Sequence, residues 1–296
     1  MDVRERERAR KGTRIGLPSA IALIVLTAGC GSPGSGPSGV RVPKVPAPTA
    51  EVLGLRLPTD TYLLSVDEIY DGEEAADLLT RQCMKKHGYD WRLIERPDFG
   101  DWRNRRRYGV VEPEVAKNFG YHPVPALLSP TEVYEKKQRR ERGLTPEEKR
   151  TATDEKTGCQ RRSNDALWRG IDYDQTLATR FNSKALADSA KDPKVVRAVR
   201  EWSSCMRRAG HEYPTLDKAI GDPRWDMRNP PSDEEKTVAV ADVKCQTEVG
   251  LIRTWFAVDS ALQKKWIEQK PSDFKRILDA KNRFLAKAKA VRAGEK

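Results

Sequence analysis

The side chains of this chain that could do chemistry by their type and spacing are above all its cysteines. Five are present, accompanied by only three histidines in 296 residues. Thiols serve as disulfide partners, metal ligands or nucleophiles, and their spacing favours one use over another. Cys83 and His87 are four residues apart and Cys205 and His211 six apart, which leaves zinc binding as an alternative, but no Cys-x-x-Cys or His-x-x-x-His pair exists. We therefore expect no metal, no cofactor and no thiol redox centre.

Four of the cysteines occur in a repeated pattern of neighbours. Cys83 and Cys205 each begin the pattern Cys-Met-basic-basic-x-Gly, whereas Cys159 and Cys245 are each followed by Gln. This order predicts a divergent duplication in which each copy carries a Cys-Met helix and a Cys-Gln helix. In an exported chain, whose thiols oxidise, it predicts the disulfides Cys83–Cys159 and Cys205–Cys245, each stabilising the fold by about 4 kcal/mol through chain entropy.

The first thirty residues have the layout of an export signal. Six basic side chains lie in residues 1–14, with three acids among them, and residues 15–28 carry no charge. The apolar run is shorter than the roughly 20 residues of a membrane-spanning helix and contains Pro18, so we expect a removable segment. An ordinary secretory signal and an uncleaved anchor are the alternatives to the lipoprotein signal described next.

The apolar run ends in Leu26-Thr27-Ala28-Gly29-Cys30, which resembles a bacterial lipobox except that Thr27 stands where Leu is usual. The resemblance implies that the Cys30 thiol is joined to a diacylglycerol, whose two acyl chains anchor stably, and that residues 1–29 are removed. The mature chain then has a formal charge of +8, because the removed residues carry six basic and three acidic side chains. Residues 30–57, rich in Gly, Ser and Pro, are expected to form a tether.

Helix signals dominate the rest of the chain. Gly88 and Gly210 are placed to end the two Cys-Met helices, and no run alternates long enough to demand a sheet. We therefore predict a mainly α body of two disulfide-linked halves, residues 58–190 and 191–296, the second ending in a basic amphipathic helix from Ser272 to about Val291. The expected helix caps are Ser65, Ser129, Thr145, Asp192 and Ser232.

The helical pattern lapses between Tyr89 and Pro130. Aromatic side chains alternate there with arginines, a combination suited to stacking on sugars or to binding an anionic chain. So long an irregular segment is either functional or packed by its own side chains, and a small core beneath a loop is the alternative. The candidate binding residues are Tyr89, Trp91, Trp102, Arg105, Arg106, Arg107, Tyr108, Tyr121 and His122.

Motifs for catalysis are missing from the sequence. It contains no Gly-x-Ser-x-Gly elbow, His-Glu-x-x-His helix or glycine-rich phosphate loop. A pair of carboxylates could still hydrolyse a polysaccharide, which keeps an envelope hydrolase as the alternative function. Its candidate residues in the irregular segment are Asp98, Asp101, Glu112 and Glu114.

The lipobox, the tether, the repeated Cys-Met pattern and the spaced Cys-Gln pairs together resemble cell-envelope lipoproteins of actinobacteria. The resemblance implies export and anchoring on the extracytoplasmic face of the cell membrane, and it implies no substrate and no catalytic residue. We therefore expect a non-catalytic binding or scaffolding module that contacts wall polymer, anionic lipid or another envelope protein through residues 89–122. An exported chain is not expected to bind nucleic acid, despite the run of arginines at 105–107.

Overall fold

The helix boundaries follow the capping residues of the sequence. A computed structural model describes residues 43–97, 100–124 and 131–294, in which Ser65 and Thr145 form reciprocal capping boxes with the Glu three residues further on. Asp192 and Ser232 cap the helices that follow them through their own side chains, and Ser129 lies outside the described residues. The elements are α1 (Ala50–Leu53), the 3-10 helix η1 (Pro58–Tyr62), α2 (Val66–Lys86), α3 (Pro113–Phe119), α4 (Thr131–Arg142), α5 (Pro146–Thr153), α6 (Cys159–Trp168), α7 (Gln175–Ser189), α8 (Pro193–Arg208), α9 (Leu216–Ile220), α10 (Asp233–Glu248), α11 (Leu251–Gln269) and α12 (Pro271–Ala293).

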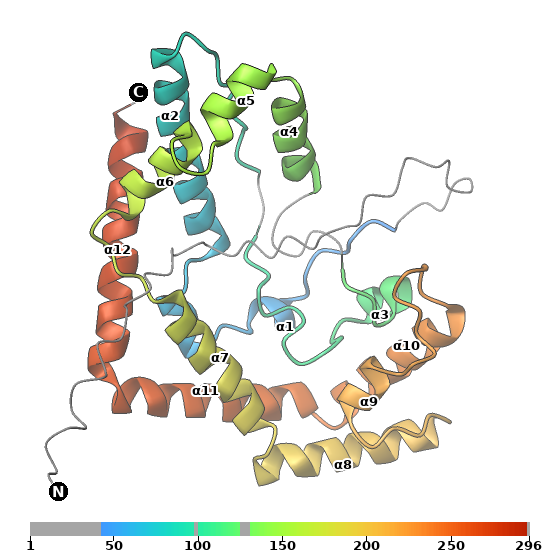
Figure 1. Cartoon of the computed structure of the whole chain (residues 1–296). Helices are drawn as coiled ribbons and strands as arrows, with labels where there is room; N and C mark the ends of the chain where they lie inside the picture. The colour runs from blue at the N-terminus through green and yellow to red at the C-terminus, as the bar shows by residue number, and fades with distance from the viewer. Residues whose placement is uncertain (1–42, 98–99, 125–130, 295–296) are drawn as a thin grey trace, which may run out of the picture. The chain divides into compact units, whose positions relative to one another are not determined.

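The described part of the chain is helical and contains no strand (Figure 1). Two disulfides tie its helices together. Cys83–Cys159 joins α2 to α6, Cys205–Cys245 joins α8 to α10, and each has a Cα–Cα distance of 5.6 Å. The mainly α class and both pairings expected from the sequence repeat are therefore confirmed.

The two Cys-Met helices end in the same way. Gly88 and Gly210 take the left-handed conformation, with φ of +80° and +87°. In both places the amide of the residue after the glycine donates to the carbonyl of a buried methionine, Met84 in α2 and Met206 in α8. A side chain at either glycine would strain the turn, so this stop signal is a property of the backbone.

Helices of the two halves expected from the sequence pack against one another in the folded protein. The last helix, α12, packs along α2 and also contacts α6, while α11 packs on α7 and α8 (Figure 1). In the other direction, α3 from the irregular segment packs on α10. Residues 43–296 form one compact unit, so the boundary at 190/191 divides the two disulfide loops without dividing the packing.

The tether expected over residues 30–57 ends earlier than its predicted limit. The signal at 1–29, Cys30 and the chain up to residue 42 lie outside the described residues. From Pro43 onward the chain belongs to the compact unit, and Val52, Leu55 and Leu57 are buried in it. These apolar side chains stabilise the stretch against the body, an effect that a prediction from Gly, Ser and Pro content overlooks.

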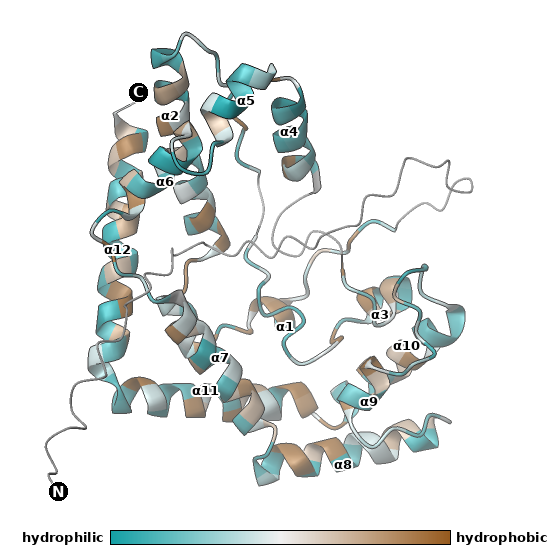
Figure 2. Cartoon of the chain, viewed as in Figure 1, coloured by the Kyte–Doolittle hydropathy of each residue, from teal (hydrophilic) through white to brown (hydrophobic). Residues whose placement is uncertain are grey.

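The last helix has the two faces expected of it. Phe274, Ile277 and Phe284 of α12 are buried, whereas Lys275 and Arg283 are exposed, and the ribbon of α12 alternates between hydrophobic and hydrophilic stretches (Figure 2). The helix extends a little beyond both predicted ends. Among the described residues, no helix is long and apolar enough to cross a membrane.

Candidate functional site

The aromatic and arginine side chains of the irregular segment lie largely inside the protein. Trp91, Arg105, Tyr108 and Tyr121 are at most 3% exposed, and His122 is 9% exposed. The remaining candidates, Tyr89, Trp102, Arg106 and Arg107, are half-buried. The structure thus brings residues 105–122 together as a polar core packed against α10 and α11, and it leaves Trp91 in a separate cluster beside the first disulfide.

Arg105 and Glu112 form a buried ion pair that holds the chain entering α1. The Arg105 Nε lies 2.6 Å from Glu112 Oε2, and both side chains are almost fully buried. Arg105 Nη2 donates to the carbonyl of Pro46, and the Thr49 amide donates to Glu112 Oε1. The pair therefore fixes the backbone of residues 46–49, and its charges are used within the molecule.

Asp259 on α11 receives the next two side chains of the segment. Arg107 Nε lies 2.7 Å from Asp259 Oδ2, and the Tyr108 hydroxyl donates to the same oxygen at 2.9 Å. Gln263, one turn further along α11, donates to Asp259 Oδ1, and its own carbonyl oxygen accepts from Thr59. Burial, and then the charge of Asp259, raise the pKa of Tyr108 far above its usual value.

Asp242 on α10 is the centre of a second site. Like Asp259, it accepts from a tyrosine and a glutamine, but no cation is bonded to it. The Tyr121 hydroxyl donates to Asp242 Oδ2 at 3.1 Å, while Trp202 Nε1 and Gln246 Nε2 each donate to Oδ1 at 2.7 Å. No lysine or arginine among the described residues is ion-paired with it. Burial raises the pKa of Asp242 to about 6, because these neutral donors and the charge of Arg106, which lies beyond ion-pair distance, compensate only part of the desolvation.

Glu235 holds the end of the segment. Its Oε1 accepts from the Tyr121 amide at 2.7 Å and lies 2.8 Å from His122 Nδ1, while His122 Nε2 faces the carbonyl of Asn229 at 2.9 Å. The Ser232-Asp-Glu-Glu235 pattern resembles a capping box, and Ser232 does cap α10. The Glu235 side chain, however, points into the protein and contacts the segment, and His122 is buried beside it.

Arginines of the chain itself stack on the tryptophan rings that the sequence suggested would stack on a ligand. The Arg140 guanidinium lies 4.0 Å from the centroid of the Trp91 ring, and the Trp91 indole N–H donates to Asp77. Arg105 lies 5.3 Å from the centroid of the Trp102 ring. These contacts stabilise the fold by the same cation–π attraction that the sequence pattern suggested for recognition.

The carboxylates proposed for hydrolysis do not form an acid and base pair. Asp98 lies outside the described residues, Glu114 is exposed, and Glu112 is held by Arg105. Partial burial raises the pKa of Asp101, but hydrogen bonds from Arg103 and from the Val66 amide outweigh it and hold that pKa below its usual value. A general acid in glycoside hydrolysis needs a raised pKa, so this arrangement gives the hydrolase alternative no support.

A possible metal-ligand group lies at the first disulfide. The ligand atoms of Cys83, His87 and Cys159 lie within 4.8 Å of one another. Both sulfur atoms are bonded to each other, and zinc binding requires free thiolates. The spacing of Cys83 and His87 noted in the sequence therefore belongs to a disulfide in this structure and gives the zinc alternative no support.

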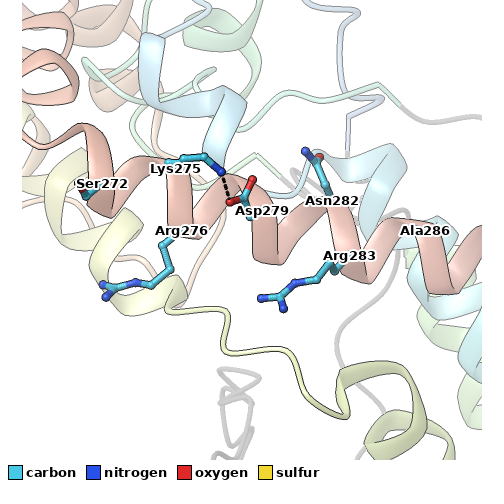
Figure 3. A pocket seen from close by; sticks show the side chains of 7 residues that line it. All are labelled: Ser272, Lys275, Arg276, Asp279, Asn282, Arg283 and Ala286. Carbon is cyan, nitrogen blue, oxygen red and sulfur yellow. Dashed lines mark hydrogen bonds and ion pairs between the residues drawn. The ribbon is translucent and has the colours of Figure 1, made fainter.

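The outer face of α12 forms a shallow polar groove. Lys275 is ion-paired with Asp279 on the next turn, whereas Arg276 and Arg283 extend together from another side of the helix (Figure 3). All four side chains are largely exposed. The groove lies on a single helix, so it could attract a charged partner but provides little shape complementarity for one.

A second, smaller cleft lies between α1 and the junction of α10 with α11. Gln246, Gly250 and Phe256 line one side, and Glu51 and Leu55 line the other. Sequence reasoning missed this cleft, together with the buried polar side chains Glu235, Asp242, Gln246, Asp259 and Gln263. The available signal was a twice-repeated Asp-x-x-x-Gln spacing on the apolar stripes of two consecutive helices.

Comparison with known proteins identifies no relative of this chain. No protein-family model matches it, no curated protein matches it, and no solved structure matches it.

Proposed function

We propose that the protein is an exported cell-envelope lipoprotein, anchored through a diacylglycerol on Cys30, that works as a non-catalytic binding or scaffolding module. The observation that carries this proposal is the pair of disulfides, Cys83–Cys159 and Cys205–Cys245. Such bonds persist in oxidising compartments and are rare where glutathione and thioredoxin keep thiols reduced. The pairing uses all four cysteines after Cys30, which leaves that one thiol for acylation.

The charge of the mature chain supports a partner of opposite sign. Removal of residues 1–29 leaves a formal charge of +8, and the exposed face of α12 carries Arg276 and Arg283. Anionic wall polymer and the anionic membrane surface both attract such a body. Arg105 is buried, and the half-buried Arg106 and Arg107 are hydrogen-bonded to Tyr121, Asp259 and Asn182. These arginines do not contribute to the surface in the way expected from the sequence, so the basic helix replaces residues 89–122 as the proposed contact.

Metabolic labelling with a palmitate analogue tests the anchor. The native chain should incorporate the label and fractionate with membranes, and Cys30→Ala should do neither. Thr27→Leu is the matched control, because it restores the usual lipobox residue and should retain both properties. Equal labelling of the native chain and Cys30→Ala would contradict the proposal.

Retention on purified cell wall at increasing salt tests the binding role. Arg276→Gln with Arg283→Gln should weaken retention at low salt, where exposed charges act over a longer range. Lys264→Gln with Lys265→Gln removes the same charge from exposed positions of α11 and should weaken it less. Complete loss of retention of the native chain at moderate salt would remove shape-specific recognition of the wall and leave only electrostatic adhesion.

A further inference from the structure

The two disulfides of the protein differ in their contact with solvent. Cys83 is half-buried and its partner Cys159 is 1% exposed, whereas Cys205 and Cys245 are only 6% and 2% exposed. A thiol that attacks a disulfide must reach one of its sulfur atoms, so access limits the rate of exchange. The first disulfide is therefore the more open of the two, and its open side is Cys83.

The partner cysteines also lie at opposite ends of their helices. Cys159 is the first residue of α6, directly after the N-cap Gly158, and the first turn of α6 contains no acidic side chain. The partial positive charge at a helix N-terminus stabilises a thiolate. Cys245 lies in the last turn of α10, where the helix dipole is negative and destabilises a thiolate. Cys159 is therefore the better leaving group.

The side chains beside the two bonds differ in charge as well. A ring nitrogen of the exposed His87 lies within 4.8 Å of both sulfur atoms of the first disulfide. At the second disulfide, Glu248 Oε2 lies 3.6 Å from Cys205 Sγ, and the other oxygen of this carboxylate is paired with Arg208. Exchange places negative charge on the sulfur atoms, which a protonated imidazole stabilises and a carboxylate opposes.

The sequence repeat contains the same difference. His87 occupies the fifth position of the pattern Cys-Met-basic-basic-x-Gly in the first copy, and Ala209 occupies it in the second. Both residues are exposed and both are the C-cap of their helix. The two copies therefore place an imidazole and a methyl group at the same point relative to a disulfide.

We infer that Cys83–Cys159 is a thiol–disulfide exchange site that reacts with a dithiol, while Cys205–Cys245 is a structural bond. One thiolate of the dithiol attacks Cys83 Sγ and forms a mixed disulfide, as the bond to Cys159 breaks and Cys159 leaves as a thiolate. The second thiolate of the dithiol then attacks its own sulfur in the mixed disulfide and releases Cys83. The dithiol is oxidised to a disulfide, and the protein gains two electrons and two protons.

Other contacts hold the two helices together when this bond opens. α2 packs along α6 and α12, and the hydroxyls of Thr80 on α2 and Ser163 on α6 are hydrogen-bonded at 3.0 Å. Exchange therefore occurs in the folded protein. The missing Cys-x-x-Cys pair predicted no thiol redox centre, but the fold brings together two cysteines that are 76 residues apart. The inference goes beyond the proposed binding role, because it adds a reaction with a thiol partner.

Timed reduction of the purified, oxidised full chain with excess dithiothreitol at pH 7 tests the inference. Samples are alkylated with iodoacetamide, and mass spectrometry of peptides reports each cysteine. We expect Cys83 and Cys159 to become alkylated about tenfold faster than Cys205 and Cys245, because access and leaving group both favour the first bond. Treatment with glutathione and then N-ethylmaleimide should leave glutathione on Cys83 and maleimide on Cys159.

His87→Ala tests the part played by the imidazole. It should slow reduction of the first disulfide roughly fivefold and leave the second unchanged, because only the first loses a positive charge beside its sulfur atoms. Ala209→His is the matched control. It places an imidazole at the corresponding point of the second copy and should leave the rate at Cys83–Cys159 unchanged.

Reduction of both disulfides at the same rate, or of Cys205–Cys245 first, would overturn the inference. Glutathione on Cys159 in place of Cys83, or an unchanged rate in His87→Ala, would overturn it as well. Circular dichroism follows the helical signal during the reaction. Loss of that signal together with the first reduction step would show that exchange follows unfolding, which contradicts a site in the folded protein. None of these results bears on acylation of Cys30.

Discussion

The Asp242 and Asp259 sites both hold a tyrosine of the irregular segment against a helix, but they differ in their charged partners. Each aspartate lies four residues before a glutamine that donates to it, on consecutive helices α10 and α11, and each accepts a tyrosine hydroxyl from the irregular segment. Asp259 also faces Arg107 at 2.7 Å. Asp242 has the Trp202 indole in the corresponding role.

This difference gives the two cross-links different charges. At Asp259 the carboxylate and the Arg107 guanidinium are buried as a pair, and each depends on the other for its stability. A buried carboxylate with neutral donors is less stable when ionised, which is why burial raises the pKa of Asp242 to about 6. The segment is therefore fixed at Tyr108 by a complete ion pair and at Tyr121 by a carboxyl group that titrates close to neutral pH.

The largest expected effect comes from breaking the ion pair. Asp259→Asn keeps the shape of the side chain but leaves the Arg107 charge buried without its partner, and we expect a loss of about 3–5 kcal/mol in the free energy of unfolding. Urea unfolding followed by circular dichroism at pH 7 measures it. Asp242→Asn breaks no direct ion pair, because Arg106 acts on Asp242 only from beyond ion-pair distance, and it should cost less at the same pH. Equal losses for the two variants would contradict the contrast between the sites.

The second effect is a pH dependence at Asp242. Because its folded pKa of about 6 lies above the ordinary value of 3.8, folding favours the protonated form, and the stabilisation is complete below pH 3.8 and lost as the pH rises through 6. The loss amounts to about 3 kcal/mol. Asp242→Asn removes this dependence, so the stability of the native chain relative to the variant should fall between pH 4 and 7.

Unfolding of both proteins over that pH range isolates the effect, because other carboxyl groups titrate equally in each. Asp226→Asn is the control, since hydrogen bonds from Arg228 lower the pKa of that exposed acid and its own contribution is therefore lost as the pH falls. A difference between the native chain and Asp242→Asn that stays constant with pH would show that Asp242 does not titrate in this range.

The smallest effect is that of the tyrosine hydroxyls. Tyr121→Phe removes one of three neutral donors from a buried carboxylate that has no direct ion pair, and we expect a loss of about 2 kcal/mol at pH 7. Tyr108→Phe leaves Asp259 with Arg107 and should cost about 1 kcal/mol. Urea midpoints of the two variants compare them. A larger loss for Tyr108→Phe would reverse the proposed order of the two sites.

The sequence predicted the fold best where the signal is local. Helix caps such as Ser65 and Thr145, the stop at Gly210 and the apolar face of α12 each depend on residues within a few positions of one another. The disulfide pairing could be predicted because a repeat carried information about distant positions. The short helix α3 in the irregular segment lacked a side-chain cap and was missed.

The polar core could not be predicted because its partners are distant in the sequence. Arg107 and Asp259 are 152 residues apart, and no local pattern joins them. Arginines next to aromatic rings look the same in a sequence whether they face solvent or a buried carboxylate. Tertiary packing decides between the two, and here it buries most of the segment expected to bind a ligand.

The account rests most directly on the chemical state of the five cysteines in the native protein. Mass spectrometry of peptides from the membrane-extracted chain, digested without reduction, reports all five at once. We expect an amino-terminal peptide that begins at Cys30 and carries a diacylglycerol, together with the linked pairs Cys83–Cys159 and Cys205–Cys245. An intact Met1 with unmodified thiols at all five positions would contradict export, anchoring and the oxidised framework together.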